Sequence, residues 1–150
     1  MTEPAGDAAR PTVGVVGLGN IGGAIAANLA ADGLAPTVTD TDRARAHAIA
    51  GATAAGSVAE VAAASEVTIT SLPTPEVVAA VAEAWAHAAA PGSILLDLST
   101  NLPDGNRQLA ERLAASGHRF VEAPLTGGAI GAQNRTLVFM VGGDADAVHR

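Results

Sequence analysis

The sequence contains no cysteine and no lysine, and aromatic residues make up only 2% of it. Without cysteine, the chain has no disulfide framework, no thiolate nucleophile and no cysteine ligand for a metal. Because all eight basic residues are arginines, these 150 residues cannot complete a mechanism that needs a lysine as acid or base. The shortage of aromatic side chains leaves a core of small aliphatic residues, which is typical of helices packed on a parallel sheet.

Long apolar runs and excess positive charge are also missing. No apolar run approaches the ~20 residues that span a bilayer, and residues 1–11 lack the apolar stretch of a signal peptide. The formal net charge of -7 argues against nucleic acid or an anionic membrane as a partner. The four histidines lack metal-ligand spacing, so no metal site is predicted. We expect a cytoplasmic protein with a mobile tail over residues 1–11 and one domain over residues 12–150.

Short apolar or β-branched segments alternate with helical patterns along the chain. Strands are predicted near residues 12–16, 36–40, 52–54, 67–71, 93–98, 119–122 and 136–141. Helices are predicted near residues 21–32, 43–50, 57–64, 75–89, 104–116 and from 144 onward. The last of these begins with two acids in its first turn. Ser57 and Glu60 form a capping-box pattern, and Asp104 is placed to cap a helix. This order predicts an α/β fold of the Rossmann type: a doubly wound, mostly parallel sheet with helices on both faces.

The most informative stretch is residues 12–30, where an apolar strand runs directly into the spacing G-x-G-x-x-G. Gly17 permits the tight turn out of the strand, Gly19 lets a pyrophosphate approach the backbone, and Gly22 lets the helix pack on the strand. The free amides and positive dipole end of that helix then face the phosphates. Asp40 closes the next strand about 20 residues further on, where an acid binds the adenosine ribose. Together these features predict a dinucleotide site.

The end of the second strand also bears on the choice of cofactor. Asp40 and Asp42 place negative charge where the extra phosphate of NADP would lie, which favours NAD. Arg43 and Arg45 fit either a helix surface or a contact to an adenosine phosphate, so NADP stays possible. The two acids also fit a solvated strand end that binds nothing.

Later motifs follow the other predicted strands, and loops at the carboxyl ends of parallel strands line one crevice. They are a Leu-Pro pair at residues 72–73, Asp-Leu-Ser-Thr at 97–100 and Ala-Pro-Leu-Thr-Gly-Gly at 123–128. With the glycine loop, in this order, they make residues 12–150 resemble the β-hydroxyacid dehydrogenases, the family of 3-hydroxyisobutyrate dehydrogenase and 6-phosphogluconate dehydrogenase. The resemblance is greatest to the 3-hydroxyisobutyrate branch.

The resemblance implies roles for individual residues. It implies contacts to the cofactor at Gly17, Leu18, Gly19, Asn20, Ile21, Gly22, Asp40, Leu72, Pro73, Val77 and Thr100. It implies that a substrate carboxylate is held by Thr126, Gly127 and Gly128, where the family usually has serine at the first position. Read without the resemblance, Ser99 and Thr100 also fit a helix N-cap, and residues 126–128 fit a plain turn.

The family's catalytic lysine, a following asparagine and a second, all-helical domain all lie beyond residue 150 in the family pattern. The resemblance therefore implies an N-terminal NAD(P)-binding domain without a catalytic residue, inactive alone, and oligomeric only with the helical domain. We expect the chain to be truncated at its C-terminus. The small substrate would be a β-hydroxy acid.

Two other functions stay open: a stand-alone nucleotide-binding module, and an imine-reductase-like enzyme that needs no lysine. An exposed apolar patch would favour the dehydrogenase over the module.

Overall fold

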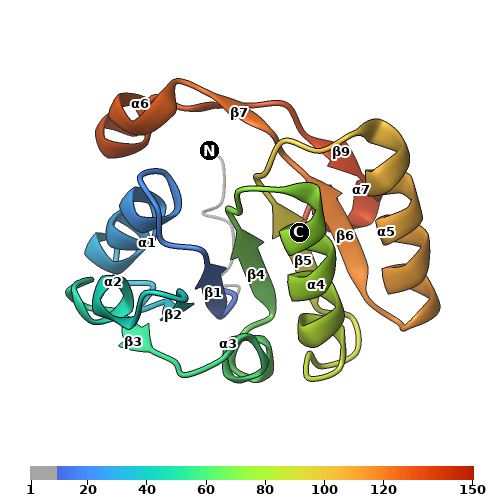
Figure 1. Cartoon of the computed structure of the whole chain (residues 1–150), viewed down its shortest axis with the longest axis horizontal. Coiled ribbons are helices and arrows are strands. Elements are labelled where there is room, and N and C mark those ends of the chain that lie inside the picture. Colours follow the sequence, from blue (N-terminus) through green and yellow to red (C-terminus); the bar gives the residue numbers. More distant parts are fainter. Residues whose placement is uncertain (1–9) are drawn as a thin grey trace, which may run out of the picture.

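The computed structural model describes residues 10–150, so the expected tail over residues 1–11 lies outside the described residues except for its last two. Seven strands form one sheet in the order β3-β2-β1-β4-β5-β6-β9 (Figure 1). They are β1 (Val13–Val16), β2 (Thr37–Thr39), β3 (Thr53–Ala54), β4 (Val67–Thr70), β5 (Ile94–Asp97), β6 (Arg119–Glu122) and β9 (Gly142–Gly143). All neighbours pair in parallel except β6 and β9. The predicted mostly parallel sheet is confirmed.

Helices cover both faces of this sheet, and each face has its own core. On one face, α1 (Gly22–Ala31) and α2 (Arg43–His47) pack against a row that includes Val15, Val38 and Ile69. On the other face lie α3 (Val58–Ala64), α4 (Pro75–Ala86) and α5 (Pro103–Ala115), around a cluster that includes Trp85, Leu95 and Phe120. Because successive side chains along a strand point to opposite faces of the sheet, Leu95 and its neighbour Leu96 pack into the cores on different faces. Within residues 10–150 no helix is long and apolar enough to cross a membrane.

Side chains cap the starts of α2, α3, α4 and α7 (Ala145–Val148), whereas α1, α5 and α6 (Gly128–Asn134) have no side-chain cap. Ser57 accepts a hydrogen bond from the Glu60 amide at 3.2 Å, and the Glu60 carboxylate accepts one from the Gly56 amide at 2.8 Å. The predicted capping box is thus confirmed, with its return bond shifted to Gly56. The cap predicted at Asp104 is wrong, because Pro103 is already the first residue of α5 and Leu102 occupies the cap position. Asp104 pairs instead with Arg107, one turn along the helix.

The chain departs most from the prediction after β6. The single strand expected over residues 136–141 is wrong: β8 (Val138–Phe139) pairs with β7 (Leu125–Thr126) in a separate two-stranded sheet, and only β9 joins the main sheet. Helix α6 (Gly128–Asn134) lies between β7 and β8 in the chain, and no pattern predicted it. The apolar run has no alternation to mark one buried face, and its residues are exposed at 44% to 59% from Val138 to Val141. The expected last helix is α7 (Ala145–Val148), capped by Asp144.

Gly14 in β1 is a packing requirement that the sequence pattern did not reveal. A Cβ at this position would lie 2.4 Å from Val61 Cγ1 and 2.5 Å from Ser65 Oγ. The missing side chain therefore lets α3 approach β1.

We expect Gly14→Ala to lower the free energy of unfolding by about 1–3 kcal/mol, because the added methyl group overpacks a closed contact. Gly105→Ala is the matched control, since a Cβ at this position in α5 meets nothing within 4 Å. That change should leave stability equal or raise it by about 0.5–1 kcal/mol. Urea unfolding of both variants measures the difference, and equal effects would contradict the packing argument.

Candidate functional site

A groove of about 730 Å³ lies at the carboxyl ends of β1, β2 and β4. It brings together eight of the eleven residues predicted to contact a cofactor: Gly17, Gly19, Asn20, Ile21, Asp40, Leu72, Pro73 and Val77. Leu18 and Gly22 belong to the same turn but face inward, and both are buried. Residues 56–58, at the start of α3, also line the groove; the capping-box pattern there predicted a helix start but gave no sign of a site. Whether these residues bind a cofactor stays a prediction.

The three glycines of the loop differ in what surrounds them. A Cβ on Gly17 would lie 2.3 Å from the Ser71 carbonyl oxygen, and one on Gly22 would lie 1.9 Å from the Gly17 carbonyl oxygen. Neither position has room for a side chain. This confirms the close packing expected at Gly22, and Gly17, with a φ of 89°, makes the expected turn out of β1. A Cβ on Gly19 would meet nothing within 4 Å. Gly19 therefore faces open space in the groove, which is where a ligand can reach the backbone.

The N-terminus of α1 is open toward this groove. Side chains cap α2, α3, α4 and α7, through Asp42, Ser57, Thr74 and Asp144. In the described part of the chain no side chain caps α1, and its first turn holds no acid. The first amides of a helix need a partner, and together with the helix dipole they favour an anion. The structure thus leaves the start of α1 ready for a phosphate group.

Asp40 holds the glycine loop in place. Its Oδ2 accepts a hydrogen bond from the Leu18 amide at 2.7 Å, and its Oδ1 accepts one from the Asp42 amide at 2.8 Å. Burial opposes the charge, but these two amides and the nearby Arg45 guanidinium outweigh it and lower the pKa of Asp40. Arg45 lies 3.8 Å from Asp40 and lines the groove. Asp40 is therefore a carboxylate held by two amides at the wall of the groove, and its contact with an adenosine ribose stays a prediction.

The loops after β4 and β5 lie against each other beside the groove. The Leu72 amide donates to Ser99 Oγ at 2.9 Å. Thr100 is exposed and is not among the residues that line the groove. The N-cap interpretation of residues 99–100 is wrong, because α5 begins at Pro103 and the Ser99 side chain bonds to Asp97.

The predicted substrate loop lies outside the groove. Thr126 ends β7, Gly127 precedes α6, and α6 packs beside α1 (Figure 1). Asn28 of α1 donates to the Ala132 carbonyl oxygen at 2.9 Å. Arg135, at the end of α6, forms an ion pair of 2.8 Å with Asp32. The structure therefore ties the loop to α1 without bringing residues 126–128 together with the other predicted site residues.

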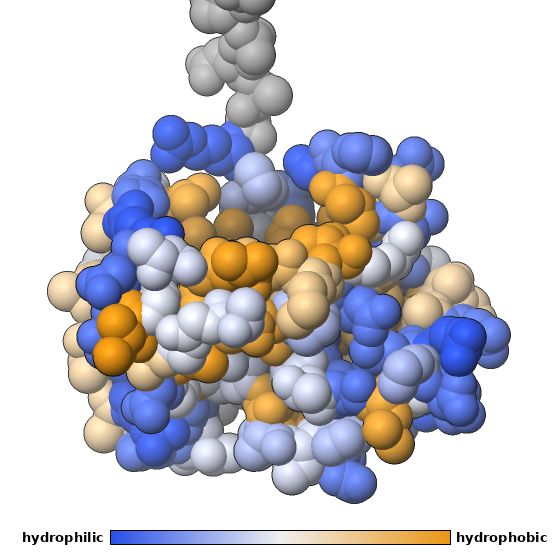
Figure 2. Space-filling view, turned by 90° about the horizontal axis from the view of Figure 1, so that it is seen from above, coloured by the Kyte–Doolittle hydropathy of each residue, from blue (hydrophilic) through white to orange (hydrophobic). Residues whose placement is uncertain are grey.

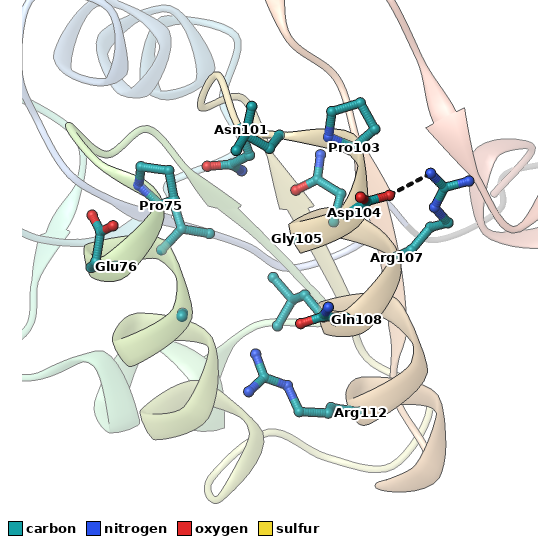
Figure 3. A pocket seen from close by; sticks show the side chains of 14 residues that line it. Pro75, Glu76, Asn101, Pro103, Asp104, Gly105, Arg107, Gln108 and Arg112 are labelled. Carbon is teal, nitrogen blue, oxygen red and sulfur yellow. Dashed lines mark hydrogen bonds and ion pairs between the residues drawn. The ribbon is translucent and has the colours of Figure 1, made fainter.

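A second hollow, of about 570 Å³, lies between α4 and α5 (Figure 3). Arg112 extends from α5 toward α4, whereas Arg107 turns away and pairs with Asp104. None of the predicted site residues lines this hollow, although Asn101, which directly follows the predicted Thr100, does. Within residues 10–150 no cluster of three side chains suited to a metal occurs.

An apolar band crosses the face that lies at the top of Figure 1, as Figure 2 shows. Val138, Phe139, Met140 and Val141 are all exposed. Phe139 and Val141 also line a hollow of about 380 Å³ that reaches the sheet between β4 and β6. Contiguous exposed apolar side chains of this kind mark an interaction surface.

The chain matches a known family over almost all of its length. The family model described as the NAD binding domain of 6-phosphogluconate dehydrogenase covers residues 12–150. A mitochondrial 3-hydroxyisobutyrate dehydrogenase of Drosophila melanogaster is 39% identical over 134 residues, which is 87% of this chain and 41% of that protein. The NAD-dependent L-serine dehydrogenase of Pseudomonas aeruginosa is 33% identical over 144 residues, 92% of this chain and 48% of that protein. These matches confirm the resemblance drawn from the motifs.

Solved structures agree with this family. The 3-hydroxyisobutyrate dehydrogenase of Mycobacterium tuberculosis, solved with L-serine, has a TM-score of 0.89 and 34% identity over 93% of this chain and 49% of that chain. An imine reductase from a Pseudomonas species has a TM-score of 0.84 and 25% identity over 93% of this chain and 50% of that chain. The chain thus spans about half the length of the relatives and structures that it matches.

The lowered pKa of Asp40 predicts a pH-dependent stability. A carboxylate whose pKa is lower in the folded state stabilises the fold above its unfolded pKa of about 3.9. That contribution is lost as the pH falls through the folded value. We expect the urea midpoint of Asp40→Asn to lie below that of the wild type between about pH 5 and 7, and the difference to shrink as the pH falls below the unfolded pKa. A difference that is the same at every pH would contradict the role of an ionised carboxylate.

Proposed function

Because this chain belongs to the family of the NAD-binding domain of 6-phosphogluconate dehydrogenase, we propose that it is the cofactor half of an oxidoreductase. The reaction is hydride transfer between a nicotinamide cofactor and a β-hydroxy acid or its semialdehyde, as in 3-hydroxyisobutyrate dehydrogenases. The observation that carries the proposal is one groove shared by the open side of Gly19, the uncapped start of α1 and the Asp40 carboxylate.

Each part of the groove has a part of the cofactor to hold. The amides at the start of α1 bind the pyrophosphate across Gly19, and Asp40 accepts hydrogen bonds from the adenosine ribose. Val77, at the groove wall in α4, lies by the adenosine side. The backbone of Leu72 and Pro73 lies along the cofactor, and Thr100, in the loop beside this segment, lies at the nicotinamide ribose.

NAD is the favoured cofactor within this proposal. Each carboxylate about 6 Å from a 2′-phosphate costs on the order of 2–3 kcal/mol per charge pair at an effective dielectric near 20. Asp40 lies in the groove, whereas Arg45 is ion-paired to Asp40 and Asp42 and so only partly offsets the repulsion.

The substrate and the second half of the enzyme complete the proposal. Thr126, Gly127 and Gly128 hold the substrate carboxylate, because amides at a glycine-rich turn form an anion-binding concavity. We assign no catalytic residue to residues 1–150, since proton transfer in this family needs a lysine that the chain lacks. The exposed apolar residues 138–141 offer a surface on which an all-helical second domain would pack. That domain would also form the oligomer. The exposed apolar surface favours the enzyme half over a stand-alone nucleotide-binding module. The proposed location is the cytoplasm, which fractionation of cells would test.

The glycine loop gives a sharp test of cofactor binding. We expect Gly19→Val to weaken NADH binding about tenfold or more, because the side chain would fill the space of the pyrophosphate, and to leave the melting temperature unchanged. Gly105→Ala is the control that should bind as the wild type does. Isothermal titration calorimetry and thermal unfolding measure the two quantities. Undiminished binding by Gly19→Val would overturn the proposed site.

Cofactor choice has its own measurement. We expect the wild-type chain to bind NADH more tightly than NADPH in fluorescence titrations, and Asp40→Asn to narrow the gap because it removes one negative charge. Equal affinities, or tighter binding of NADPH by the wild type, would contradict the preference for NAD.

Turnover tests the assignment of the chemistry. With NAD and 3-hydroxyisobutyrate, the 150-residue chain should show little or no formation of NADH, because it supplies no proton acceptor at the substrate hydroxyl. A rate typical of dehydrogenases, at about 1 s⁻¹ or above, would show that a residue of this chain is catalytic.

A further inference from the structure

A buried carboxyl group, Asp97, lies behind the groove at the end of β5. It is completely shielded from solvent. Its Oδ1 accepts hydrogen bonds from Thr70 Oγ1 at 2.7 Å, from Ser99 Oγ at 2.7 Å and from the Ser99 amide at 3.2 Å. Its Oδ2 accepts one from Asn101 Nδ2 at 2.6 Å. Burial of a carboxyl group is costly unless such donors surround it, so this cluster is a built arrangement.

The cluster joins two loops that approach the groove. Because the Ser99 hydroxyl donates its hydrogen to Asp97, its lone pairs are free to accept the Leu72 amide at 2.9 Å. Asp97 thereby fixes, through Ser99, the point at which the chain enters the Leu72–Pro73 segment. Thr100 lies between Ser99 and Asn101, and both of these neighbours bond to the same carboxyl group.

Asp97 itself does not line the groove. It therefore has no contact with a ligand there and acts only through Ser99, Asn101 and Leu72. The glycine loop is held separately, by the hydrogen bond from the Leu18 amide to Asp40. The two halves of the groove are thus positioned by two independent carboxyl groups.

We propose that Asp97 is a positioning residue for the nicotinamide half of the cofactor site, acting through Ser99 on the Leu72–Pro73 segment and on Thr100. This assignment rests on the function proposed above. Removing the link should loosen the nicotinamide half while leaving the pyrophosphate and adenosine contacts in place.

The test compares a whole and a shortened cofactor on Ser99→Ala in the 150-residue chain. Ser99→Ala breaks the relay to Leu72 but leaves Asp97 with Thr70 and Asn101. We expect about five- to tenfold weaker binding of NADH, the effect of one lost hydrogen bond, and a smaller enhancement of NADH fluorescence. Binding of ADP-ribose, which lacks the nicotinamide, should stay unchanged. Ser99→Thr keeps the hydroxyl and should restore NADH binding, and Ser116→Ala is the matched control on the surface.

The outcomes separate the two proposals. If the wild type binds neither NADH nor ADP-ribose, the proposed function fails, and this assignment fails with it. If the wild type binds NADH and ADP-ribose, and Ser99→Ala weakens the binding of both ligands equally or of neither, the proposed function stands. The assignment of Asp97 to the nicotinamide half is then overturned. Should Ser99→Ala not fold, Asn101→Ala takes its place. It keeps the bond from Leu72 to Ser99 but removes the other bond beside Thr100 from a residue that is only partly buried, and unchanged NADH binding by this variant would overturn the assignment.

Discussion

The close contact between the start of α1 and the turn after β1 sets the geometry of the whole site. Gly22 lies so near the Gly17 carbonyl oxygen, and Gly17 so near that of Ser71, that no side chain fits at either position. This contact aims the first amides of α1 past Gly19 into the groove. Asp40 then fixes the loop from the second strand, and the Leu72 segment bounds it from β4. Because β1, α1 and the two strands beside β1 (β2 and β4) meet here, a change at this point would displace all of them.

The sequence predicted the parts of the molecule in which local pattern and tertiary role coincide. The glycine spacing, the apolar strands and Asp40 each have one physical use, and the structure brings them to one groove. Asp97 was recognised only as part of a motif. Its partners come from the loop after β5 and from Thr70 at the end of β4, which lies 27 residues away in the sequence. Gly14 gave no signal, since its constraint comes from Val61 on a later helix.

Prediction was weakest where the structure depends on distant partners. Helix α6 is too short to form through its own propensity. It is held by Asn28 and by the Arg135–Asp32 ion pair, whose members lie 103 residues apart. The apolar run after it could not be divided between two sheets, because its residues do not alternate. The cap wrongly assigned to Asp104 shows the opposite error. Asp104 is a residue type that caps helices, but α5 already begins at Pro103, so Asp104 lies inside its first turn.

The segment between β6 and β9 leaves the end of β6 and comes back beside it, because β9 pairs with β6. Pro124 accepts a hydrogen bond from the Met140 amide, and Gly142 pairs with Glu122. The residues in between form β7, α6 and β8, so they make a closed detour with both ends fixed on one strand. Insertions, deletions or replacements within such a detour leave the register of the parallel strands as it is. Residues 126–128 and the exposed run 138–141 can therefore vary without a shift in the parallel strands, as long as the bonds of α6 to Asn28 and Asp32 are kept.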